Sequence, residues 1–244
     1  MKPLWAQLGA ETRLTLRRGE SLLLTLGIPV ALLVFLALTK VLPKPSDGAN
    51  YLVPGVLALA IMSTGMVSVG IATAFEREYK VLKRLGATPL GRPRLVAAKV
   101  LSVVVIEVVQ AAVVICAGLA LGWRPGAASG TVAAFSALGA AICATAGFTG
   151  VGLLMAGRLR ADIVLALANG LWLVLLLLGG MLFPLSKLPS GLRDLAEGLP
   201  ASALAGALRS AMGSGGHVPG HDWVVLVIWA VGAPLAAALT FLWE

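Results

Sequence analysis

Six long apolar runs constrain this chain more than any other feature of its sequence. They cover residues 21–41, 52–75, 100–121, 131–156, 163–183 and 223–243. A helix of about 20 apolar residues, rising 1.5 Å per residue, crosses a hydrocarbon core about 30 Å thick. Backbone polar groups within a bilayer must pair inside their own segment, and no run alternates as a barrel strand would. The runs therefore predict an all-α membrane protein with six transmembrane helices.

Composition excludes a soluble domain. Hydrophobic residues make up 59% of the 244 residues and charged residues 12%, whereas soluble domains carry about 25% charged residues. The net charge of +8 would be compatible with nucleic acid as a partner. However, the Lys and Arg residues stand between the apolar runs and form no continuous basic region. We therefore expect membrane lipid, and no nucleic acid, as the surroundings of this chain.

The loops between the runs indicate how the chain is oriented. Most of the Lys and Arg precede the first run, separate the second run from the third, or separate the fourth from the fifth. Because cytoplasmic loops carry an excess of these residues, both termini are expected in the cytoplasm. A cleaved signal peptide is the alternative at the N-terminus. The first run is of full spanning length and no cleavage site follows it, so we expect this segment to remain in the protein as a transmembrane helix.

Two segments outside the runs have the pattern of short helices. Residues 1–19 place apolar side chains on one face and basic ones on the other, which predicts an amphipathic helix on the inner leaflet. The outer loop, residues 184–222, holds two amphipathic pieces around 188–196 and 200–212, with Pro200 suited to a first helical turn. We expect short re-entrant or interfacial helices there, and a solvated loop is the alternative.

Residues 76–86, between the second and third runs, predict a third short helix. Its apolar and basic side chains separate onto two faces, and Glu76 and Lys80 form an i,i+4 pair. Thr88, which precedes Pro89, ends it. A helix of this kind can dock in a groove of a soluble partner. The alternative is a topology-setting loop that contacts only lipid head groups, and physical reasoning alone leaves both open.

Glu107 is the one carboxylate well inside a run, and Gln110 follows on the same helical face. An ionisable residue at that depth is costly, so both residues are candidates for a translocation path. An interhelical hydrogen bond is the other explanation. If Glu107 carried a proton cycle, the protein could instead be a proton-coupled secondary transporter or channel that acts without an ATPase.

No reactive cluster is evident in the sequence, so we expect no catalytic residue and no enzymatic activity. His217 and His221 have the spacing of a helical zinc pair, but Pro219 and Gly220 interrupt the helix between them. No metal site is therefore expected. Small residues at steps of four in the fourth run, such as Gly139 and Gly147, predict close helix packing within the bundle or at a dimer seam.

Several motifs together resemble the permeases of type-2 ABC exporters, and the resemblance covers nearly the whole chain. They are Glu76-Arg77-Glu78, LGATPL at 85–90, the basic stretch 94–99, GGMLFPL at 179–185 with the Leu-Pro pairs that follow, and FLWE at 241–244. The actinobacterial drug- and antibiotic-resistance members are the most similar.

The resemblance implies that residues 1–244 form one transmembrane domain of a bacterial plasma-membrane exporter for an amphipathic or lipid-like compound, such as a drug, antibiotic or lipid. It implies a homodimer that works with two copies of a separate ABC ATPase subunit. Residues 1–19 would be the connecting helix and 76–86 the coupling helix. The residues expected to couple to the ATPase are Glu76, Arg77, Lys80, Lys83, Arg84, Thr88 and Pro89. The chain has no G-x-x-x-x-G-K-[ST] stretch, which is the motif that binds nucleotide phosphates. ATP and magnesium would therefore bind the partner subunit, and this chain would bind no cofactor.

Overall fold

The computed structural model describes residues 9, 19–39, 49–81, 92–126, 130–213 and 217–240. Within these ranges the chain forms helices joined by turns, and no strand occurs. The all-α prediction is therefore confirmed for the described residues. The predicted amphipathic helix over 1–19 and the C-terminal 241–244 fall outside them, apart from Gly9 and Gly19.

The apolar runs form the long helices of the structure. Their bounds are α2 Gly19–Leu38, α3 Ala49–Met62, η1 Ser63–Ser68, α4 Val69–Glu78, α6 Arg92–Ala120, α7 Thr131–Ala156, α8 Ala161–Leu178 and α11 Gly220–Thr240. The three segments α3, η1 and α4 follow one another without a break, and η1 is a turn of π-helix within this second span.

Five stretches of the described chain are long and apolar enough to cross a membrane. They are Asn50–Glu78, Arg94–Ala120, Thr131–Arg158, Ala161–Leu178 and Gly220–Thr240. In the first run, α2 has 20 residues, and its apolar part Leu26–Leu38 is the portion whose side chains the structure describes. Five of the six predicted transmembrane helices are thus supported by length and composition, and the sixth stays a prediction.

The end of α8 differs clearly from the prediction. The fifth run was expected to continue to residue 183, but α8 ends at Leu178. Gly179 caps it, and Gly180 has a φ of +65°. Side chains disfavour this left-handed conformation, whereas glycine adopts it readily, so the glycine pair stops the helix and turns the chain.

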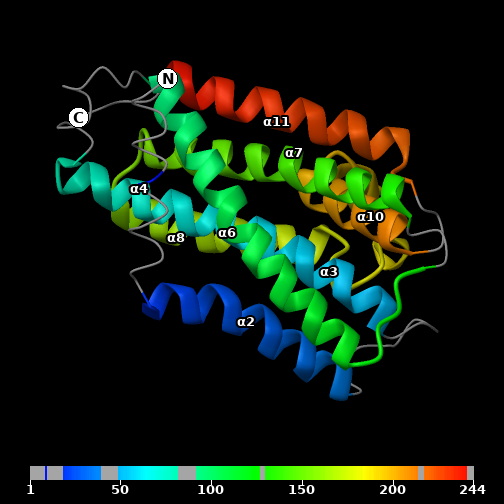
Figure 1. The fold of residues 1–244 in the computed structure, drawn as a ribbon. Helices are drawn as coiled ribbons and strands as arrows, with labels where there is room; N and C mark the ends of the chain where they lie inside the picture. Colours follow the sequence, from blue (N-terminus) through cyan, green and yellow to red (C-terminus); the bar gives the residue numbers. More distant parts are fainter. Residues whose placement is uncertain are drawn as a thin grey trace.

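The long helices lie side by side between two ends of a bundle (Figure 1). At the first end, which we call the α4 end, α4 and α11 finish and α2, α6 and α8 begin. At the opposite α10 end lie η2 Leu185–Lys187, α9 Ser190–Glu197 and α10 Pro200–Met212. Helix α7 occupies the middle and packs against α11, α10 and α4.

The described part of the outer loop is helical, as predicted from its two amphipathic pieces. Pro200 lies in the first turn of α10, and most of α10 is buried against α7, α3 and α11. Helix α9 exposes Leu192 and Leu195 instead. The segment is therefore helical and α10 packs within the bundle, whereas insertion of these helices into the outer leaflet stays a prediction.

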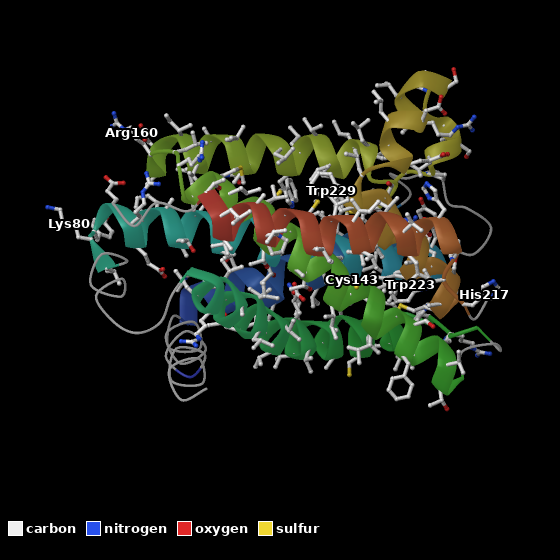
Figure 2. The ribbon with its side chains drawn as sticks, turned by 90° about the horizontal axis from the view of Figure 1, so that it is seen from above. Lys80, Cys143, Arg160, His217, Trp223 and Trp229 are labelled. Atoms are coloured by element: carbon white, nitrogen blue, oxygen red, sulfur yellow. The ribbon has the colours of Figure 1, made fainter. Side chains whose placement is uncertain are left out.

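Glycines allow α7 and α11 to approach closely. A Cβ on Gly147 would lie 3.2 Å from the Cβ of Trp229, and one on Gly139 would lie 2.9 Å from the Trp223 ring. Figure 2 shows Trp223 and Trp229 along α11, where it crosses α7. The small-residue face of the fourth run thus packs within the bundle, which confirms the first of its two predicted uses.

Replacing Gly150 with Ala is expected to destabilise the bundle by about 1–3 kcal/mol, because the added methyl group overpacks this contact. A Cβ there would lie 2.6 Å from the carbonyl carbon of Ala233, which belongs to the backbone and cannot rotate away. Thermal unfolding in detergent measures the effect. Gly170→Ala on α8 is the matched control, since nothing lies within 4 Å of its Cβ position. Equal midpoints for the two variants would contradict this packing.

Candidate functional site

A cavity of about 950 Å³ lies between α2, the continuous α3–η1–α4 span, α6 and α8. Along the second span its lining extends from Leu59 in α3 to Val81, beyond the end of α4. Ligand pockets commonly measure about 300–1,000 Å³, so this cavity can hold a drug-sized molecule.

The π-helical turn η1 places polar side chains in the cavity wall. Its two hydroxyl side chains form hydrogen bonds to different helices. Trp172 Nε1 of α8 donates to Ser63 Oγ at 2.7 Å. Thr64 Oγ1 donates to Gln110 Oε1 of α6 at 3.3 Å. All four residues line the cavity. Single π-turns inside α-helices occur frequently at functional sites. Here η1 links α6 and α8 across the cavity.

An ion pair forms part of the lining at the α4 end. Lys99 Nζ of α6 lies 2.9 Å from Glu76 Oε2 of α4, and only 3% of the Lys99 side chain is exposed. Glu76 was predicted to contact an ATPase. Its carboxylate bonds within the bundle and joins α4 to α6, and its contact with an ATPase stays a prediction.

Arg77, the next predicted coupling residue, also bonds within the bundle. Its guanidinium donates to the Ala156 carbonyl at 2.8 Å and to the Leu159 carbonyl at 2.9 Å. Ala156 ends α7, and Leu159 lies in the turn that leads to α8. Arg77 therefore fastens the end of α4 to the α7–α8 turn.

The chain turns sharply after α4. Tyr79 and Lys80 form a turn in which Lys80 has a φ of +60°. Residues 76–78 thus belong to α4, and only later residues could form a separate coupling helix. Residues 82–86 of the predicted coupling helix, including Lys83 and Arg84, lie outside the described ranges. The predicted coupling residues Thr88 and Pro89 also lie outside them.

The surface of the α4 end carries exposed charged and apolar side chains. The side chains from Glu78 to Val81 are exposed, and Figure 2 shows Lys80 and Arg160 together at this end, opposite His217. Arg160 lies in the α7–α8 turn and is 81% exposed. These side chains are available to a partner at the α4 end.

The two translocation-path candidates on α6 contact different neighbours. Gln110 lines the cavity and accepts a hydrogen bond from Thr64, whereas Glu107 pairs with Thr145 of α7 and is not part of the lining. Three helical residues correspond to a rotation of 300°, so their side chains point about 60° apart. Glu107 is 7% exposed, and its Oε1 has no hydrogen-bond partner among the described residues.

Sequence reasoning missed the contacts of a partly buried arginine at the α10 end. The Arg209 guanidinium donates to the carbonyls of Gly180 at 2.5 Å and Met181 at 2.7 Å, and it stacks 3.9 Å from the Tyr51 ring centroid. The Tyr51 hydroxyl also donates to Gly180, at 3.1 Å. Burial lowers the pKa of Arg209, but arginine stays charged in proteins. The arginine within the apolar α10 was the only sequence signal for this contact.

No group of three or more His, Cys, Asp or Glu side chains could hold a metal ion within the described ranges. Of the two histidines with the spacing of a zinc pair, His217 lies before α11 and His221 lies in its first turn. His221 Nδ1 lies 3.6 Å from Asp222 Oδ1.

Comparison with known proteins gives a family match over most of the chain. Residues 3–212 match the family described as ABC-2 type transporter. The matched segment includes the whole described cavity lining, α4 and α10 but not α11. No curated protein matches the chain significantly.

Proposed function

The chain belongs to the ABC-2 type transporter family, and from that premise we propose that it is the translocating subunit of an ATP-driven exporter. Members of this family are membrane subunits of ABC transporters and normally work with an ATPase subunit. The observation that carries the proposal is the 950 Å³ cavity, whose lining continues to the exposed turn at the α4 end. The cargo is an amphipathic or lipid-like compound, such as a drug, an antibiotic or a lipid.

Coupling to the ATPase proceeds through the contacts at the end of α4. The ATPase binds the exposed Lys80 turn and the segment that follows it, which includes Lys83, Arg84, Thr88 and Pro89. Arg77 transmits displacement of α4 to the α7–α8 turn, and Glu76 transmits it to α6 through Lys99. Helices α6 and α8 form two walls of the cavity. Movement of the ATPase therefore changes the shape of the cavity.

The assembly is a homodimer of this chain with two ATPase subunits in a bacterial plasma membrane. Large apolar side chains are exposed along α6, α8 and α11 and must be covered by lipid or a second copy. Both termini are cytoplasmic. In support, α2 begins and α11 ends at the α4 end, which also carries Lys80 and Arg160.

One observation favours a second candidate, a proton-coupled secondary transporter or channel without an ATPase. Glu107 is a buried carboxylate within a span, and its Oε1 has no hydrogen-bond partner among the described residues. Such residues often belong to proton relays. The family match favours the ATP-driven function, because these permeases normally have an ATPase partner.

The double variant Lys83→Glu/Arg84→Glu tests the coupling segment. Reversal of both charges is expected to lower substrate-stimulated ATPase activity of the reconstituted complex by about tenfold, because charge complementarity governs docking. Membrane insertion should be unchanged. Arg193→Glu in α9 reverses a charge at the opposite end and serves as the matched control. Equal stimulated activity in the double variant and the control would overturn this assignment.

A further inference from the structure

The cavity has one predominantly aliphatic wall. Helix α2 contributes Ile28 and Leu32 to it, and α6 contributes Val103 and Ile106. None of these four side chains can form a hydrogen bond. A ligand that contacts this wall must therefore present an apolar surface, since burial of an unpaired polar group is costly.

Other lining side chains offer hydrogen bonds at the level of η1. Ser63 accepts from Trp172, so its own hydroxyl proton remains for an acceptor. Thr64 donates to Gln110, so its oxygen lone pairs remain for a donor. The indole of Trp172 adds a flat apolar face beside these groups. This level can pair with both donor and acceptor groups of a ligand.

The charges of the described lining cancel. Its charged side chains are Glu76 and Lys99, which form the 2.9 Å ion pair at the α4 end. The level of η1 has hydroxyl, amide and indole groups but no charged group. A charged ligand there would lose its hydration without meeting an opposite charge, which is unfavourable at membrane depth.

We infer that the cavity binds an uncharged amphiphile, with its hydrogen-bonding group at Ser63, Thr64 and Gln110 and its apolar body against α2 and α6. This inference rests on the proposed transport function and specifies its substrate class. Lipids with charged head groups and ionised drugs are excluded as cargo for this site. The ion pair at the α4 end contacts only the end of the ligand nearest to it.

Probe binding to the full-length chain in phosphatidylcholine nanodiscs tests the inference without an ATPase. The probes are Nile red, which is uncharged and planar, rhodamine 6G, which is cationic, and 8-anilinonaphthalene-1-sulfonate, which is anionic. Energy transfer from tryptophan, corrected with empty nanodiscs, reports binding. We expect saturable binding of Nile red, and binding of each charged probe at least about tenfold weaker.

Variants connect the binding to the η1 level. Thr64→Val with Gln110→Leu is expected to weaken Nile red binding about tenfold, because it removes two of the hydrogen-bonding side chains at the η1 level. Ser63→Ala is a milder variant for the case in which the double variant does not fold. Thr73→Val is the matched control, since Thr73 is buried on α4 but does not line the cavity.

Two results would overturn the inference: absence of saturable Nile red binding to the wild-type chain, or charged probes that bind as tightly as Nile red. Equal affinity of Ser63→Ala and Thr73→Val would also contradict the assignment to η1. Co-purification of an ATPase subunit with the chain is a separate experiment, and it tests the proposed transport function. The substrate class can therefore fail while the proposed transport function stands.

Discussion

Replacement of Glu76 with Gln is expected to destabilise the protein by about 3 kcal/mol, because it removes the carboxylate partner of a buried charge. Lys99 is only 3% exposed, and its ammonium lies 2.9 Å from Glu76 Oε2. The amide of the variant keeps the size of the side chain but cannot neutralise the ammonium. The destabilisation should therefore arise from charge and not from lost volume.

Thermal unfolding in detergent measures this effect against two comparisons. Glu78→Gln is the matched control, since Glu78 belongs to the same helical turn but is exposed. In the double variant Glu76→Leu/Lys99→Met, apolar side chains replace the whole pair, and most of the stability should return. An unfolding midpoint for Glu76→Gln equal to that of Glu78→Gln would contradict the role of this ion pair.

Arg77→Gln is expected to separate ATP hydrolysis from transport. The guanidinium holds the carbonyls of Ala156 and Leu159 at 2.8 and 2.9 Å, and a glutamine amide cannot reproduce this forked contact. Without it, displacement of α4 would no longer move the α7–α8 turn. We expect transport by the reconstituted complex to fall about tenfold while basal ATP hydrolysis continues, with a ΔΔG of about 1.5–3 kcal/mol for each lost charged hydrogen bond.

The number of substrate molecules moved per ATP hydrolysed is the readout for Arg77, because a merely destabilising change would lower both activities together. Arg193→Gln is the control, since Arg193 lies in α9 at the opposite end of the bundle. Arg77→Lys should restore only part of the coupling, since an ammonium is not a planar fork. An unchanged ratio in Arg77→Gln would show that this contact does not transmit movement.

The long helices could be predicted from sequence because the bilayer requires long apolar segments. Five of the predicted runs form helices of spanning length. Where an observed helix end differs from the predicted one, the residues at that end explain the difference. Gly179 and Gly180 ended α8 early, whereas α6 begins at Arg92, before the apolar run starts at residue 100. Basic residues can continue a helix beyond the hydrocarbon, so hydropathy alone places such an end too late.

The candidate site was less predictable, because it depends on contacts between residues far apart in the chain. Ser63 meets Trp172 and Arg77 meets Leu159 only after the helices pack. A π-turn such as η1 has no periodicity that differs clearly from an α-helix over six residues. Glu107 and Gln110 share one helical face, but only the packed bundle decides that Gln110 lines the cavity.

The central claim is that this chain works with a separate ATPase, and affinity purification from mildly solubilised native membranes tests it most directly. Mass spectrometry should identify a soluble ATPase subunit that is recovered in equal amount with the chain. Reproducible recovery of the chain alone, together with proton-driven transport by that preparation in liposomes, would contradict the claim and make Glu107 the leading residue of the mechanism.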